Sequence, residues 1–112
     1  MQIDWARLHQ LQEDVGTEDI RGIITLFEQE LKQVIAQLPL EAEPAQMANN
    51  LHYLKGCALN LGFNDLARLC QQSFDHLNTD PAPPITLAPI LECYESATQA
   101  LRQSLDDQLG GL

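Results

Sequence analysis

The chain has 112 residues, enough for one compact domain and too few for a nucleotide-binding enzyme domain with a second unit beside it. Sixteen acidic residues against six basic ones give a net charge of −10, which disfavours nucleic acid and anionic membrane surfaces as partners. Hydrophobic residues make up 45% of the chain, but no apolar run approaches the roughly 18 residues of a membrane span. The N-terminal residues lack the basic start and apolar stretch of an export signal. We therefore expect a cytoplasmic monomer with a single domain over residues 1–112.

The three cysteines are Cys57, Cys70 and Cys93. They form no CxxC pair, and their odd number argues against a disulfide framework. We interpret them as small apolar residues of the core, and we expect no metal site.

Two helices are predicted in the first third of the chain. Asp4 is a suitable N-cap for a short first helix, and Gly16 stands where helices end. Thr17 is predicted to cap a second helix, in which apolar residues recur at helical spacing from Ile20 to Leu38. This stripe is the clearest periodic signal in the sequence.

Two further helices follow a short connection that Pro39 and Pro44 bracket. The third is predicted to run from Pro44 to about Gly62, a natural stop. Asn64 can cap the fourth, whose apolar positions repeat at helical spacing to Leu77. A tight turn therefore joins these two helices.

A last helix is predicted after the proline-rich stretch Asn78–Pro84. It carries apolar residues at helical spacing from Leu87 to Leu105, has Pro89 in its first turn, and ends at Gly110 and Gly111. No segment alternates apolar and polar residues as a half-buried strand does. The sequence therefore predicts an all-α fold, an antiparallel up-down four-helix bundle with a short extra N-terminal helix.

His52 is predicted to face solvent, because it lies roughly 140° from the centre of the apolar stripe of its helix. Gly56 lies in the interior of the same helix, where glycine is less favourable than alanine by about 0.5–1 kcal/mol. Helical side chains tilt toward the N-terminus, so bulk at position 56 would crowd the imidazole four residues earlier. Lys55 can bring its ammonium beside His52. We expect an open imidazole with one cation in reach.

The charge distribution sets this helix apart. The 21 residues from Pro44 to Asn64 contain no Asp or Glu, although 16 acidic residues in 112 predict three in such a stretch. Lys55 and Arg68 are the only basic residues between Gln33 and Leu101. Such a surface suits a site that holds a phosphoryl group and approaches an acidic partner pocket.

Leu59 and Phe63 project within about 20° of His52 on the helical wheel. Two large apolar groups on an outer face indicate a docking surface, with Arg68 beside it. In the alternative interpretation, Phe63 follows the end of the helix and turns inward to cover the core.

The segment Leu51–Leu66 reads LHYLKGCALNLGFNDL. It resembles the signature of the histidine-containing phosphotransfer (HPt) domain, in which HxLKG is followed by small residues and a glycine. The resemblance implies an intermediate of a two-component phosphorelay: His52 would accept a phosphoryl group from a phosphoaspartate of a receiver domain, as in a hybrid histidine kinase, and pass it to an aspartate of a response regulator. It also implies that Lys55 stabilises the phosphate and that Gly56 provides clearance.

This chemistry needs few groups, because a neutral imidazole is already a nucleophile. The resemblance implies that the receiver domain supplies Mg²⁺ and an acidic pocket, so we expect no cofactor bound by this chain. The sequence has neither a GxxxxGK[ST] loop nor a kinase glycine loop. We expect a phosphocarrier without an ATP site or autokinase activity.

Two alternatives compete with this interpretation. In the first, the protein is a non-catalytic helical adaptor that binds a partner through the face of Leu59 and Phe63, and His52 is incidental. In the second, the bundle binds a metal, but such sites usually use Glu-x-x-His pairs. None of His9, His52 and His76 has a glutamate three residues before it.

Overall fold

The computed structural model describes residues 3–79 and 85–110. Within these ranges the chain forms five α-helices and one short 3₁₀ helix, and no strand. The elements are α1 (Trp5–Val15), α2 (Ile20–Gln37), η1 (Leu38–Leu40), α3 (Pro44–Asn60), α4 (Asn64–Leu77) and α5 (Ala88–Leu109). The prediction of an all-α fold is confirmed.

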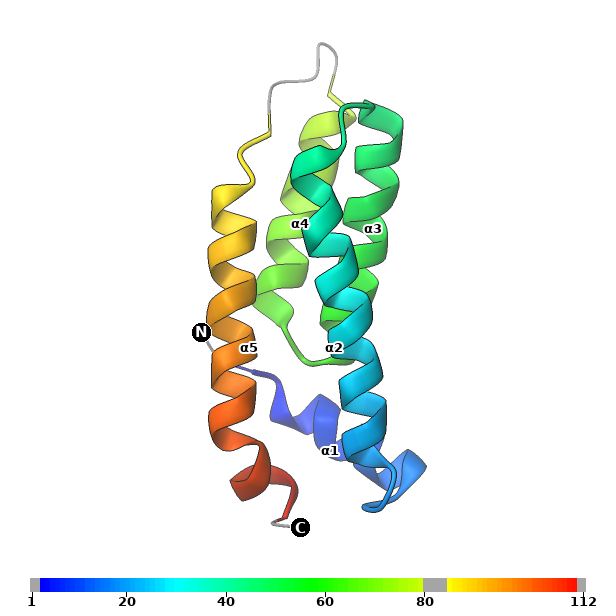
Figure 1. The fold of residues 1–112 in the computed structure, drawn as a ribbon, viewed down its shortest axis with the longest axis vertical. Helices are drawn as coiled ribbons and strands as arrows, with labels where there is room; N and C mark the ends of the chain where they lie inside the picture. The colour runs from blue at the N-terminus through cyan, green and yellow to red at the C-terminus, as the bar shows by residue number, and fades with distance from the viewer. Residues whose placement is uncertain (1–2, 80–84, 111–112) are drawn as a thin grey trace.

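The molecule is elongated, with extents of 50 × 22 × 20 Å. Helices α2 to α5 lie lengthwise along the long axis, and the short α1 lies across the lower end (Figure 1). The turn between α3 and α4 lies directly above α1 in this view, whereas η1 and the connection to α3 are at the upper end (Figure 1). The most extensive packing is between α3 and α4, which places these two helices side by side.

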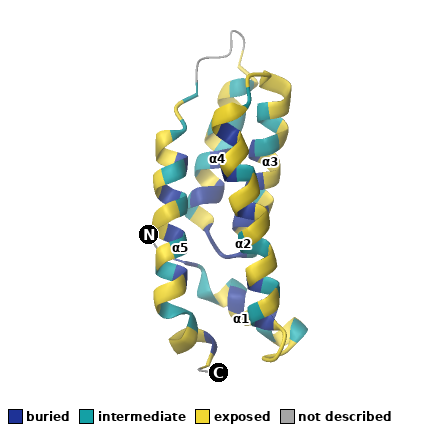
Figure 2. Cartoon of the chain, in the orientation of Figure 1, coloured by how far each residue is buried: buried dark blue, intermediate teal, exposed yellow. Residues whose placement is uncertain are grey.

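The core is built from the inward stripes of the long helices (Figure 2). On α2 the buried residues are Ile20, Ile24, Leu31 and Ile35, at the helical spacing that the sequence shows. Every buried residue in the described part of the chain is apolar or a cysteine. The three cysteines are free thiols buried in this core, as predicted.

The ends of α1 agree with the sequence, but the start of α2 does not. Asp4 caps α1, since its Oδ1 accepts a hydrogen bond from the Arg7 amide at 3.3 Å. Gly16 follows the last residue of α1 with φ of 90°. The prediction that Thr17 caps α2 is wrong, because Asp19 occupies the N-cap. The Asp19 amide donates to the Gly16 carbonyl at 3.2 Å, so residues 17–19 form a turn before the helix begins.

The turn after α3 holds the N-terminal segment in place. Gly62 has φ of 73°, and its carbonyl accepts a hydrogen bond from the Asp4 amide at 2.8 Å. A Cβ atom at this glycine would lie 2.6 Å from the Asp4 carbonyl oxygen, so only glycine fits. The prediction that Asn64 caps α4 is wrong: Asn64 is the first helical residue, and its side-chain Nδ2 donates to Asp4 Oδ2 at 3.3 Å. Asn64 instead binds the N-cap residue of α1.

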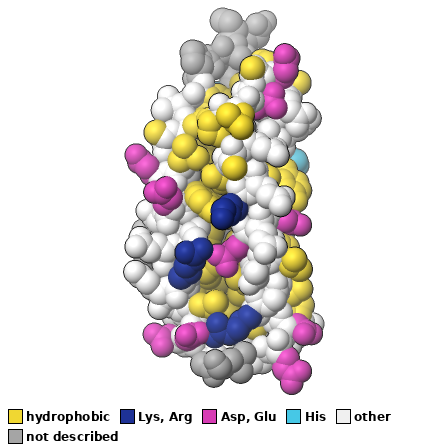
Figure 3. Space-filling view, viewed as in Figure 1, with side chains coloured by type: hydrophobic (Ala, Val, Ile, Leu, Met, Phe, Trp, Pro, Cys, Tyr) yellow, Lys and Arg dark blue, Asp and Glu magenta, His cyan; other side chains and the backbone are white. Residues whose placement is uncertain are grey.

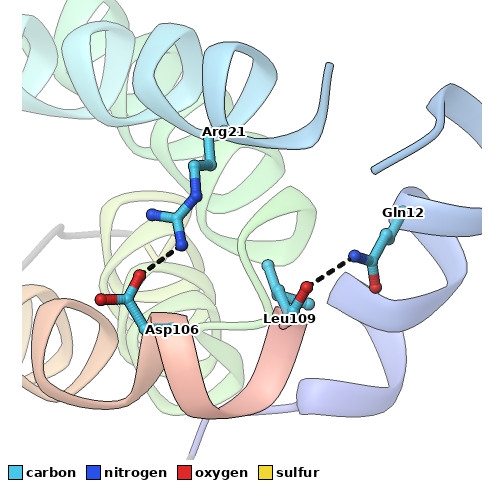
Figure 4. A network of polar contacts seen from close by, with 4 residues as sticks. All are labelled: Gln12, Arg21, Asp106 and Leu109. Carbon is cyan, nitrogen blue, oxygen red and sulfur yellow. Dashed lines mark hydrogen bonds and ion pairs between the residues drawn. The ribbon is translucent and has the colours of Figure 1, made fainter. Parts of the chain in front are cut away.

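Polar contacts also join α1 and α2 to the C-terminal end of α5 (Figure 4). Gln12 Nε2 donates to the Leu109 carbonyl at 2.9 Å, and Arg21 forms an ion pair with Asp106. Pro89 lies in the first turn of α5, and Gly110 follows its last residue, as predicted. Residues 80–84 of the predicted proline-rich connection and Gly111 lie outside the described residues.

The face formed by α2 and α5 carries a group of basic side chains flanked by acidic ones (Figure 3). A groove of about 200 Å³ lies on it, lined by Thr25, Glu28, Gln29, Lys32, Tyr94 and Arg102. Burial raises the pKa of Glu28, and the nearby Arg102 opposes this shift. No helix in the described part of the chain is long and apolar enough to cross a bilayer.

Candidate functional site

His52 lies in the middle of α3 with its side chain exposed to solvent, as predicted. The buried residues of this helix are Leu51, Leu54, Cys57 and Ala58. These four residues form the inward stripe, so the geometry of the helix turns position 52 away from the core. The imidazole is available to a partner from the solvent side.

Helix α4 supplies a neighbour for the imidazole. The rings of His52 and Phe74 have centroids 6.0 Å apart, with an angle of 46° between their planes. Phe74 is half-buried and packs against the hydrophobic core. One side of the imidazole therefore borders a ring that the scaffold holds in place.

On α3 itself, Gly56 leaves open space beside His52. Gly56 is exposed, and apart from the adjacent residues and the backbone of its own helix, a Cβ atom built there would meet no atom within 4 Å. This glycine is thus not required by packing within the chain. The open space lies over the position four residues earlier, which is that of the imidazole.

Lys55 is turned toward α4. Its Nζ donates to Gln71 Oε1 at 2.7 Å, and Gln71 Nε2 donates to Asp75 Oδ1 at 2.8 Å. Lys55 is half-buried, and its ammonium contacts the neutral amide of Gln71, while the carboxylate of Asp75 contacts the other end of that amide. Lys55 and His52 therefore both reach toward α4, where their neighbours Gln71 and Phe74 lie one turn apart.

The predicted docking surface needs a correction. Leu59 is 42% exposed, as expected, but Phe63 is 0% exposed and belongs to the core. The helical wheel does not apply to Phe63, because α3 ends at Asn60 and the chain reverses at Gly62. The Phe63 amide then donates to the Ala58 carbonyl at 2.8 Å, which directs the side chain inward. The adaptor alternative thereby loses one of its two anchors.

Arg68 is exposed on α4, where its guanidinium lies 3.6 Å from the carboxylate of Asp65 in the same helix. Both side chains are largely solvated, and such a pair contributes little to stability. Arg68 is thus free to exchange this partner for another anion.

On the side of α2, the site is bordered by Tyr53, Cys57 and Glu30. Tyr53 is 50% exposed, and Cys57 Sγ lies 3.9 Å from Glu30 Oε2. Burial chiefly raises the pKa of the Cys57 thiol, and the neighbouring thiol chiefly raises that of the Tyr53 phenol. Both groups stay neutral near pH 7, so this flank is aromatic and uncharged up to Glu30.

Gln71, Phe74 and Asp75 are not among the site residues predicted from the sequence. The sequence did contain a signal for Gln71 and Phe74, because the Lys55–Gln71 and His52–Phe74 pairs are each centred on Phe63 in the turn. Lys55 and Gln71 are each eight residues from it, and His52 and Phe74 are each eleven. Two antiparallel helices have the same rise per residue, so residues equidistant from a tight turn lie at the same level.

Within the described ranges, the histidine, cysteine, aspartate and glutamate side chains form no group of three or more that could hold a metal ion.

An all-helical fold with an exposed histidine in the middle of a long helix, flanked by a lysine and an open glycine, has the features of a histidine phosphocarrier. The model of the Hpt domain family matches residues 22–109, and the chain belongs to this family. Hpt domains take part in phosphotransfer in two-component signalling, where they interact with receiver domains. Comparisons with curated proteins and with solved structures gave no significant match.

Proposed function

We propose that this protein is a phosphorelay intermediate in which His52 accepts a phosphoryl group from a phosphoaspartate of one receiver domain and passes it to an aspartate of another. The observation that carries the proposal is the exposed imidazole beside the open space at Gly56. Helices α2 to α5 serve as an antiparallel up-down four-helix scaffold, and the whole chain acts as one domain. The protein is a carrier and needs no ATP site.

The transfer step requires only a nucleophilic nitrogen. A lone pair on one ring nitrogen of His52 attacks phosphorus, and the bond between phosphorus and the aspartyl oxygen breaks with its electrons returning to the carboxylate. The other ring nitrogen keeps its proton. The reverse displacement, by a carboxylate of the second receiver domain, regenerates the imidazole. Positioning and charge neutralisation dominate such phosphoryl transfers.

Lys55 neutralises part of the phosphoryl charge in this proposal. Its ammonium is held toward α4, 2.7 Å from Gln71 Oε1, and Gln71 lies one turn along that helix from the Phe74 ring that borders His52. A charge-assisted hydrogen bond from an ammonium to a phosphoryl oxygen is among the stronger polar contacts in proteins. We assign no cofactor to this chain and place Mg²⁺ in the acidic pocket of the partner receiver domain.

The receiver domain would dock on the outer face of α3. Tyr53 and Leu59 supply exposed apolar area, and the segment from Pro44 to Asn64 contains no acidic residue that would repel an acidic pocket. Arg68 on the adjacent α4 adds a cation at the edge. Phe63, which is buried, has no part in this surface.

A transfer assay tests the proposal. The purified protein is mixed with a receiver domain carrying labelled phosphoaspartate, and acid-labile, alkali-stable label on the chain is measured over time. His52→Gln should remain unlabelled. His9→Gln and His76→Gln are matched controls, because both histidines are exposed on other helices and should leave labelling unchanged. Label on His52→Gln at the wild-type level would refute the proposal.

A further inference from the structure

One face of α4 borders the proposed site and carries polar side chains that have no role in the transfer step described above. Gln71, Phe74 and Asp75 are spaced i, i+3 and i+4, so they project from the same side of the helix. Gln71 is half-buried and bonds to Lys55 and Asp75 at once. It is thus the group that joins the ammonium of α3 to α4.

The chemistry of its two neighbours fixes the orientation of the Gln71 amide. An ammonium has three donors and no acceptor, so the group facing Lys55 must be the amide oxygen. An ionised carboxylate only accepts, so the group facing Asp75 must be the amide nitrogen. A flipped amide would lose both hydrogen bonds, which are 2.7 Å and 2.8 Å long. Asp75 therefore orients Gln71, and Gln71 presents its oxygen to Lys55.

A neutral amide at this position has an electrostatic advantage over a carboxylate. The Lys55 ammonium has no direct contact with a carboxylate here, because the carboxamide of Gln71 lies between it and Asp75. One ammonium proton is bonded to Gln71, and two remain for phosphoryl oxygens. The flexible lysine stem is already ordered, so less conformational entropy is lost when the phosphoryl group arrives.

We propose that Gln71 is a positioning residue for phosphoryl transfer, which holds the Lys55 ammonium beside His52 through a side-chain oxygen that Asp75 orients. This inference rests on the proposed roles of His52 and Lys55. It adds a residue of α4 to the transfer residues His52, Lys55 and Gly56, which all lie on α3.

Substitutions at position 71 test the role. Gln71→Leu removes the acceptor and should slow phosphorylation of His52 by about two- to tenfold, the factor associated with one hydrogen bond. Gln71→Glu should slow it more, because the new carboxylate pairs with Lys55 and repels the phosphoryl group. Gln72→Leu is the matched control, since Gln72 is the next residue of α4 and is exposed.

Substitutions at position 75 separate orientation from charge. In Asp75→Asn the side-chain oxygen can still accept from Gln71, so the rate should stay near that of the wild type. In Asp75→Leu the acceptor is lost, and the rate should fall toward that of Gln71→Leu. Equal rates for these two Asp75 variants would overturn the orienting role.

A double-mutant cycle shows whether Gln71 acts through Lys55. Gln71→Leu should have no further effect in a Lys55→Ala background, and an undiminished effect there would overturn the positioning role. Lysine ammonium NMR supplies a readout without phosphate: Gln71→Leu should speed proton exchange at Lys55. If exchange speeds up and transfer does not change, the contact is only structural and the inference fails. The proposed function fails separately, through label on His52→Gln.

Discussion

The imidazole of His52 and the ring of Phe74 lie 6.0 Å apart between centroids, with their planes inclined by 46°. Phe74 is anchored by its contacts with the core, whereas His52 is exposed. The aromatic ring thus limits the orientations that the imidazole can adopt on the side of α4. We infer that the scaffold orients the nucleophile as well as presenting it.

Replacing Phe74 with leucine should slow phosphoryl transfer while the fold is kept. Leucine preserves apolar contact with the core but loses the aromatic pair, which is worth about 0.5–1.5 kcal/mol beyond its area, or about two- to tenfold in rate if the pair persists in the transition state. The measurement is the rate of label transfer to His52, with helix content followed by circular dichroism. Phe27→Leu is the control, because Phe27 is half-buried on α2. Equal rates for the two variants would remove Phe74 from the site.

Substitution of Gly56 should separate stability from transfer. Nothing lies within 4 Å of a Cβ at this position, so Gly56→Ala should stabilise the helix by about 0.5–1 kcal/mol in urea unfolding. Gly56→Gln should keep the fold but slow transfer from a receiver domain, because the longer side chain leans over His52.

Gly22 provides the matched control for this series. It is also helical, exposed and free of neighbours within 4 Å, but it lies in α2. Gly22→Gln should leave transfer unchanged. Wild-type transfer in Gly56→Gln would show that the clearance at position 56 has no function.

Gly62→Ala should destabilise the protein through two separable effects. The positive φ of 73° strains any L-residue, at a cost of about 1–3 kcal/mol, and the new Cβ would meet the Asp4 carbonyl oxygen at 2.6 Å. Gly16→Ala has a φ of 90° without any atom within 4 Å, so it isolates the backbone strain. Urea unfolding should show a larger loss for Gly62→Ala, and equal losses would mean that the close approach is relieved at no cost.

The stability of the protein should fall on the alkaline side because of Cys70. Burial raises the pKa of this thiol to about 12 from its ordinary value of 9.0, with a smaller contribution from Cys93. A raised folded-state pKa stabilises the protein fully below the unfolded value, and this stabilisation is lost as the pH rises from 9 toward about 12. The loss approaches about 1.4 kcal/mol per pH unit for one thiol. Unfolding of wild-type protein and Cys70→Ala at several pH values measures it; identical slopes would refute the assignment.

Much of the fold was predictable from the sequence, because periodicity and caps act locally. Asp4, Gly16 and Pro89 lie at helix ends where their backbone preferences place them. The prediction failed at Thr17 and Phe63, where the chain leaves the helix. A helical wheel assigns directions only while the helix continues, so the inward turn of Phe63 depends on the Gly62 reversal.

Of the residues proposed to act in phosphoryl transfer, only those on α3 were predictable. His52, Lys55 and Gly56 belong to one short motif, so local sequence suffices to bring them together. Gln71 and Phe74 belong to the next helix, and only the packing of α4 on α3 brings them to the site. The composition of a single sequence does not reveal such contacts between helices. The position of the turn nevertheless determines which residues of α3 and α4 lie at the same height along the bundle.

The attachment of α1 to the turn at Gly62 also gives the protein an internal optical probe. Trp5, the one tryptophan in the sequence, is in the first turn of α1 and packs against the core. Its fluorescence should therefore report whether the N-terminal helix is seated. Phosphorylation of His52, in the middle of α3, should leave this signal constant. A change in tryptophan fluorescence would therefore report detachment of α1 and not phosphorylation.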